Sequence, residues 1–121
     1  MRFLVVLAYI GGMFALSSWH HPPSVTKVPY ADKVVHTIEY GILGGLATWA
    51  LPLGMASAQR IVSAIGLGLA VGAADETYQK SVPGRESSLR DLVADVVGVS
   101  LGALLREQRQ RHSRIAVIHL P

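Results

Sequence analysis

Four apolar stretches, separated by short polar segments, constrain the fold of this chain more than any other feature of its sequence. They cover residues 3–18, 34–53, 61–74 (with the helix expected to continue to 79) and 91–105. A helix needs about 20 residues to cross a hydrocarbon core of ~30 Å. The second stretch reaches that length, and the others reach it only if their polar ends also lie at membrane depth. We therefore predict an all-α, polytopic membrane protein with a bundle of four transmembrane helices.

The composition points the same way. Half of the residues are hydrophobic and 16% are charged, against about a quarter in ordinary soluble domains. Most of the 12 glycines lie in or next to the apolar stretches, as expected where small residues let membrane helices approach closely. The chain has no cysteine, which excludes disulfides, thiolate metal sites and cysteine nucleophiles.

The predicted organisation is one membrane domain over residues 1–105 and a basic cytoplasmic tail over residues 106–121. The first apolar stretch could also be a cleaved signal peptide. It is followed by Trp19, two histidines and two prolines, which resemble an interfacial anchor and a helix stop more than a small-x-small cleavage site. We therefore expect a retained helix. The end of the tail, from Ile115, is expected to be disordered or to lie on the membrane.

Each of the last three stretches carries a Gly-x-x-x-Gly motif: Gly41 and Gly45, Gly68 and Gly72, Gly98 and Gly102. This spacing places both glycines on one helix face and permits close contact between backbones. We expect the motifs to serve packing within the chain. A homodimer through the same faces is the alternative.

Charge is sorted unevenly between the two predicted sides of the membrane. One side carries six arginines and one acidic residue, and the other carries five basic and seven acidic residues. A dense arginine run beside the last stretch (Arg106, Arg109, Arg111 and Arg114) favours both termini in the cytoplasm under the positive-inside rule. These arginines form no stripe of the kind that reads nucleic acid, and they suit anionic headgroups. We therefore expect membrane lipids as partners and no nucleic acid.

Polar residues gather at the predicted outer ends of three helices. Helical spacing places the members of each set near one another: Asp32, His36, Glu39 and Tyr40 on the second helix, Asp75, Glu76 and Gln79 on the third, and Asp91 and Asp95 on the fourth. Residues 96–105 span only about 15 Å of helix. Asp95 should thus lie near the headgroups, where an ionised side chain is costly unless it faces a partner or water. We interpret the set as a candidate ligand-binding site around one outer cavity, with Tyr40 and Tyr78 at its rim.

Arg85 follows a Pro-Gly turn in the loop between the third and fourth helices. There it can neutralise carboxylates, or it can hold a phosphate or carboxylate group of a ligand as a planar fork. We include it in the candidate site. The alternative for the whole set is a purely structural role, in pairs such as His36 with Asp95 or Arg90 with Asp91.

The sequence assigns no catalytic residue. His36 and Glu39 are spaced for a metal pair that nearby carboxylates could complete as a Mg²⁺ or Ca²⁺ site, but no zinc-ligand spacing is present. We expect neither a metal nor a cofactor. Ser87 and Ser88 have no evident base beside them, which argues against a serine nucleophile.

Two blocks of sequence resemble the VanZ-like family. They read Asp32-Lys33-x-x-His36-x-x-Glu39-Tyr40-Gly41-x-Leu43 and Asp75-Glu76-x-x-Gln79-x-x-x-Pro83-Gly84-Arg85-x-x-Ser88-x-x-Asp91-x-x-x-Asp95. The resemblance covers residues from about 30 to 105, with one small departure, Thr37, where the family often has an aromatic residue. It implies a bacterial membrane protein with several helices and no established biochemical activity. The family is named after an accessory protein for resistance to the glycopeptide teicoplanin.

The resemblance and the polar set lead to two hypotheses. The first, which we favour, is a non-enzymatic accessory protein of the cell envelope that binds an envelope lipid, a lipid-linked cell-wall intermediate or a glycopeptide at its outer face. The second is an intramembrane hydrolase or transferase acting on a phosphorylated or acylated lipid, with His36 or a carboxylate as general base and Arg85 holding the anion. A proton-coupled transporter would need more polar residues along the helices than the sequence provides.

Overall fold

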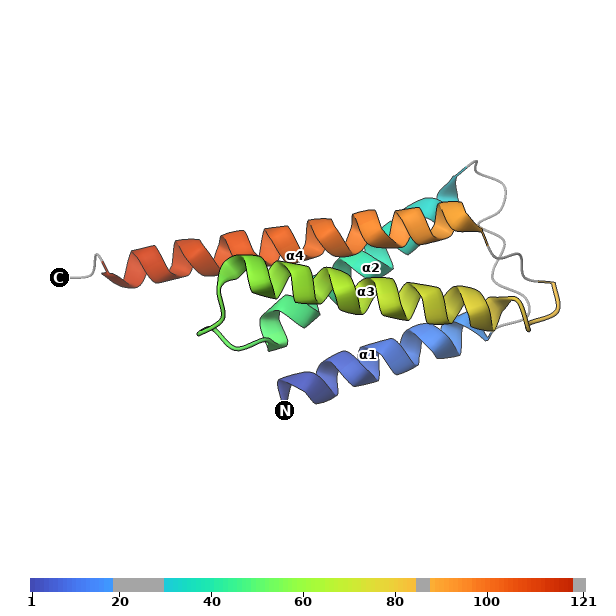
Figure 1. Ribbon diagram of the computed structural model, residues 1–121, viewed down its shortest axis with the longest axis horizontal. Helices are drawn as coiled ribbons and strands as arrows, with labels where there is room; N and C mark the ends of the chain where they lie inside the picture. The colour runs from blue at the N-terminus through green and yellow to red at the C-terminus, as the bar shows by residue number, and fades with distance from the viewer. Residues whose placement is uncertain (19–29, 85–87, 119–121) are drawn as a thin grey trace.

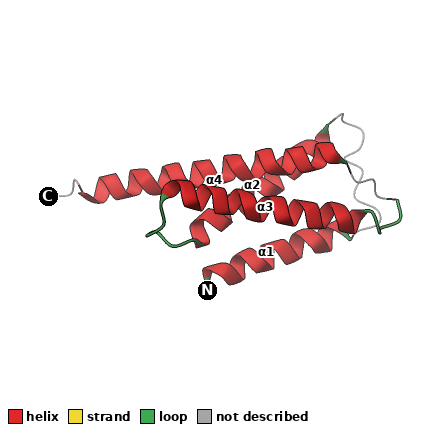
Figure 2. Ribbon diagram, in the orientation of Figure 1, coloured by secondary structure: helices red, strands yellow, loops and turns green. Residues whose placement is uncertain are grey.

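The computed structural model describes residues 1–18, 30–84 and 88–118. They form four helices and no strand: α1 (Arg2–Ser17), α2 (Ala31–Ala50), α3 (Ser57–Gln79) and α4 (Leu89–Ile118). Successive helices run in opposite directions, so the two termini lie toward one end of the bundle (Figures 1 and 2). We call this the terminal end, and we call the opposite end, where α2 and α4 begin and α1 and α3 finish, the polar end. The all-α prediction is confirmed.

Glycines allow α2 and α4 to pack backbone against backbone. A methyl group on Gly44 would overlap the backbone of Val99, and one on Gly102 would overlap the backbone of Gly41. Because both overlaps involve main-chain atoms, no side-chain movement could relieve them. The glycine-bearing faces of α2 and α4 therefore face each other within one chain, which is the use of the motifs that we expected.

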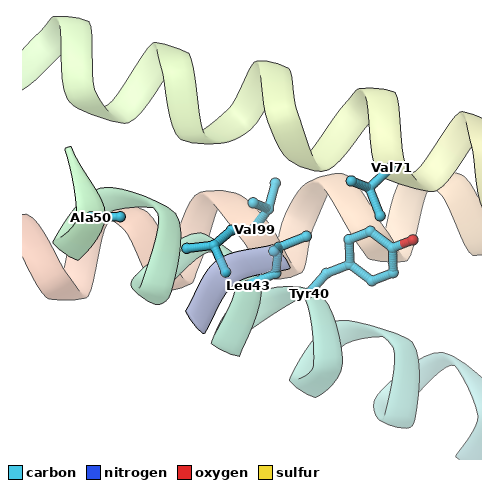
Figure 3. Packing of buried hydrophobic residues seen from close by; sticks show 6 residues of the cluster. Tyr40, Leu43, Ala50, Val71 and Val99 are labelled. Atoms are coloured by element: carbon cyan, nitrogen blue, oxygen red, sulfur yellow. The ribbon is translucent and has the colours of Figure 1, made fainter. Parts of the chain in front are cut away.

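α3 covers the seam between α2 and α4. A methyl group on Gly68 would come within 2.6 Å of Val99 Cγ2, so the side chain of Val99 lies directly on this glycine. Figure 3 shows Leu43 beside Val99, and the ring of Tyr40 extending from α2 toward Val71 of α3. α1 packs against α2 and α3. The apolar core is thus narrow and consists mainly of small and medium-sized side chains.

Polar side chains lie inside this bundle while large apolar side chains face outward. The buried polar residues are Ser17, Thr48, Arg60, Asp75, Gln79, Asp91, Asp95 and Glu107. The exposed apolar residues come from every helix and include Leu4 and Leu7, Ile38 and Ile42, Val62 and Leu69, and Val97 and Leu101. A soluble helical bundle has the opposite arrangement, with its apolar stripes directed at the core.

Within the described part of the chain, α3 alone is long and apolar enough to cross a membrane by length and composition. α1 is apolar but has 16 residues. α2 has 20 residues with charges in its first turns, and α4 has 30 with charges at both ends. Helix length and composition thus support one membrane span directly.

Two helix ends differ from the sequence-based boundaries. α4 continues through most of the predicted tail to Ile118, because residues 104–111 are mostly good helix formers. Its last turns project beyond the other helices at the terminal end (Figure 1). α2 stops at Ala50, since Leu51 adopts an extended conformation with ψ 147°, as the residue before a proline commonly does. The anchor expected at Trp19 lies outside the described residues.

Candidate functional site

A hydrogen bond between His36 of α2 and Asp95 of α4 forms the centre of the polar end. His36 Nδ1 lies 2.8 Å from Asp95 Oδ1, and the two side chains are 14% and 1% exposed. The two can meet because Gly98, one turn along α4, lets the helices approach until a methyl group there would overlap the carbonyl of Thr37. The imidazole also stacks on Tyr40, with ring centroids 6.4 Å apart and planes 6° apart.

A second ionic contact joins the same helices nearer their ends. Lys33, one turn before His36, forms a salt bridge to Asp91 of α4 and another, of 2.5 Å, to Asp32. Asp91 therefore pairs across the helix interface and not with its neighbour Arg90, the pairing that we had considered. The side chain of Asp32 is 62% exposed, so this residue lies at the outer edge of the set.

α3 contributes carboxylates that connect α1 and α4. Gln79 Nε2 donates to Asp75 Oδ2 at 2.7 Å and to Ser17 Oγ of α1 at 3.1 Å. Glu76 Oε2 accepts the backbone N–H of Ser88 at 2.9 Å, just before α4 begins. One oxygen of each carboxylate is thus engaged, that of Asp75 by Gln79 of the same helix and that of Glu76 by the backbone just before α4.

Four buried oxygens at the polar end have no hydrogen-bond partner among the described residues: Tyr40 OH, Asp75 Oδ1, Glu76 Oε1 and Asp95 Oδ2. Electrostatic interactions connect Tyr40 with all three carboxylates. A methyl group on Gly72, one turn before Asp75, would come within 3.2 Å of Asp95 Oδ2, so the α4 carboxylate reaches the face of α3. Tyr40 is 1% exposed and lies within this group, not at a rim as expected.

Glu39 and Tyr78 lie around this centre. The backbone carbonyl of Glu39 accepts a 2.9 Å hydrogen bond from Tyr9 OH of α1, and the Glu39 side chain interacts electrostatically with His36. Tyr78 is 38% exposed and its hydroxyl lies 2.8 Å from Ser18 Oγ. Arg85 lies outside the described residues.

The chemistry open to the polar end follows from its hydrogen-bond acceptors and its histidine. The unpartnered oxygens are mainly carboxylate acceptors, which suit a group that presents N–H or O–H donors. A histidine held by an aspartate can also serve as a general base. Within the described ranges, no three histidine, aspartate or glutamate side chains are arranged to hold a metal ion.

A buried charge pair toward the terminal end was missed by the sequence reasoning. Arg60 of α3 and Glu107 of α4 are 0% and 2% exposed. Arg60 Nη2 donates to Glu107 Oε1 at 2.5 Å, Arg60 Nε donates to Oε2 at 3.0 Å, and Ser57 Oγ donates to Oε1 at 2.5 Å. We had counted both residues only as loop and tail charges. The available signal was a lone arginine opening an apolar helix and a lone acid within an arginine run.

Comparison with known proteins gives a family but no individual relative. The family model described as VanZ/LLP1 matches residues 2–107, which include α1, α2, α3 and most of α4. The comparisons with curated proteins and with solved structures gave no significant match. Because the match covers well over half of the sequence and includes every residue of the polar end, the chain belongs to the VanZ/LLP1 family.

Proposed function

We propose that the protein crosses the cytoplasmic membrane with all four helices and has both termini in the cytoplasm. The support is the distribution of side chains, apolar outward and polar inward. The charges that interrupt the apolar runs of α2 and α4 are paired with each other, His36 with Asp95 and Lys33 with Asp91. Ionisable residues inside a membrane are tolerated when they face the bundle and have such partners. The arginine-rich terminal end then lies in the cytoplasm.

We further propose that the polar end binds the polar part of an envelope molecule without transforming it. The observation that carries this proposal is the group of four buried oxygens that have no hydrogen-bond partner in the described part of the chain. Leaving a buried polar group unpaired costs about 1–3 kcal/mol, so a ligand that supplies donors gains binding energy from each one it satisfies. Three of the four oxygens belong to carboxylates, which act only as acceptors when ionised.

This preference for donors narrows the class of ligand. Hydroxyl, amide and ammonium groups all present N–H or O–H donors. They are abundant in lipid-linked cell-wall intermediates and in glycopeptides, and some envelope lipid headgroups carry them. We therefore propose an accessory role in the cell envelope, with tolerance to a glycopeptide such as teicoplanin as its phenotype.

Asp75→Asn tests this role, because the substitution replaces an acceptor oxygen with a donor while keeping the shape of the side chain. Asp32→Asn is the matched control, since it makes the same change at the exposed edge of the same end. We expect Asp75→Asn to reduce glycopeptide tolerance in a sensitised strain at normal membrane abundance, and Asp32→Asn to behave as the wild type. Equal tolerance in both variants would refute the proposed site.

The His36–Asp95 hydrogen bond favours one alternative, a lipid hydrolase or transferase. Asp95 would orient the imidazole, and His36 would act as general base toward water or a substrate hydroxyl. Among the described residues, no serine or threonine hydroxyl is hydrogen-bonded to His36, so a nucleophile activated by His36 is not part of the described site. His36→Gln separates the two functions. An enzyme should bind the co-purified molecule but no longer convert it, whereas a binding protein should show no product with either form.

A further inference from the structure

A groove of about 620 Å³ lies at the terminal end, far from the carboxylates of the polar end. The start of α1, the end of α2 and the projecting last turns of α4 form its walls. Arginines line one part (Arg2, Arg106, Arg109 and Arg114), and apolar side chains line the rest, among them Trp49 and Ile118.

Two of these arginines are held in place by the end of α2 and by the turn that follows it. Arg2 Nη1 donates to the carbonyl of Trp49 at 3.2 Å, and the guanidinium lies 5.2 Å from the centre of the Trp49 ring. Arg114 Nη2 donates to the carbonyl of Leu53 at 2.8 Å. These contacts orient the groups toward one space, and each guanidinium has five N–H donors in total.

The groove carries positive charge. Among the described residues, none of those that line it is acidic. Glu107, which lies beside Arg106 in the sequence, is directed into the bundle and held by Arg60. Arg106 Nε is buried and has no hydrogen-bond partner among the described residues. Clustered guanidinium groups without a carboxylate among the described lining residues suit a phosphate, which they bind through paired N–H···O contacts.

We propose that this groove binds the phosphodiester headgroup of an anionic phospholipid from the cytoplasmic leaflet. The apolar wall is what favours a lipid over a free phosphate, because Trp49, Val117 and Ile118 can lie along the glycerol and acyl region. Tryptophan is also typical of the membrane interface, and basic pockets between helices on the cytoplasmic side are suited to such headgroups. The inference rests on the proposed membrane topology but not on ligand binding at the polar end.

The test compares lipids retained by the full-length protein in native mass spectrometry, after mixing it with phosphatidylglycerol or phosphatidylcholine of identical acyl chains. We expect the wild type to retain phosphatidylglycerol preferentially. Each arginine near an anionic surface contributes on the order of a factor of 5 in affinity, so Arg106→Gln together with Arg109→Gln should weaken this retention at least about tenfold. Arg109→Gln alone should weaken it about fivefold. Arg111→Gln is the matched control for this single variant, since it also removes one positive charge from α4 but at a residue that does not line the groove.

Three results of this experiment would overturn the proposal. Equal retention of the two lipids by the wild type overturns the proposal without any variant. An equal loss in Arg111→Gln overturns it as well, because the effect would then be a general surface charge effect. Displacement of phosphatidylglycerol by equimolar inorganic phosphate would assign the groove to a free anion. Lipid retention that is unchanged in Asp75→Asn separates this site from the one at the polar end.

Discussion

Replacement of Glu107 by leucine should destabilise the bundle strongly, because it leaves Arg60 buried without its counter-charge. Arg60 is fully buried, and its side-chain hydrogen bonds within the described ranges all go to Glu107. Arg111 also approaches Glu107, at 3.8 Å, but its side chain is 62% exposed. The contact between Arg60 and Glu107 therefore dominates the effect of the substitution.

The expected loss of stability depends on the difference in burial between Arg60 and Arg111. Removing one partner of a buried ion pair costs about 3–5 kcal/mol, whereas an exposed pair contributes about 0.2–1 kcal/mol. Glu107→Leu should therefore lower the free energy of unfolding by about 4 kcal/mol, and Arg111→Gln by less than about 1 kcal/mol. Arg60 Nη1 has no partner among the described residues, so the native pair is itself incompletely satisfied. Arg60→Met with Glu107→Leu should return to within about 1 kcal/mol of the wild type.

The assay is equilibrium unfolding in mild detergent, followed by tryptophan fluorescence and circular dichroism, for both single variants, the double variant and Arg111→Gln. If Glu107→Leu does not fold well enough to measure, recovery of folded protein in the double variant carries the test. A Glu107→Leu protein as stable as Arg111→Gln, or a double variant less stable than Glu107→Leu, would show that Glu107 does not neutralise a buried charge on Arg60.

Three further predictions follow from the packing, the topology and the loop. Gly44→Ala should lose at least about 1–3 kcal/mol of stability because its methyl group would overlap the Val99 backbone, while Gly66→Ala, with open space around it, should fold like the wild type in the same unfolding assay. Cysteines at Ser24 and Ser87 should react with an impermeant thiol reagent in intact cells and a cysteine at Ser113 should not; the reverse pattern would overturn the orientation. Arg85→Lys should impair glycopeptide tolerance at normal membrane abundance if its planar fork reads a ligand; full activity of Arg85→Lys, with loss of folded protein in Arg85→Ala, would make Arg85 a structural counter-ion.

Helical spacing predicted much of the polar end, because residues three and four apart must share a helix face. His36 and Asp95 could be considered as a pair because both lie near the predicted outer ends of their helices, and the glycine motifs indicated that helices approach closely there. Spacing within one helix does not give the depth of a side chain or the rotation of the next helix. This is why Asp32 lies at the edge and Tyr40 lies inside, neither of which the sequence distinguished.

The pairing of Arg60 with Glu107 was beyond the sequence for a different reason. The two residues are 47 positions apart, and their contact depends on how α3 crosses α4. Without that crossing, both could only be counted as cytoplasmic charges. The extension of α4 to Ile118 was missed because the polar residues after Leu105 were interpreted as a tail. A helix that continues past the apolar stretch can be polar on all sides, so the loss of apolar residues did not mark the end of the helix.

The proposed binding site at the polar end can be tested by mass spectrometry of the molecules that co-purify with the protein. We expect the wild type and Asp32→Asn to carry the same envelope molecule, rich in hydroxyl, amide or ammonium groups, and Asp75→Asn and Asp95→Asn to have lost it at equal yield of folded protein. A molecule retained equally by all four proteins, or no difference between wild type and variants, would contradict the claim that the buried oxygens of the polar end form a binding site.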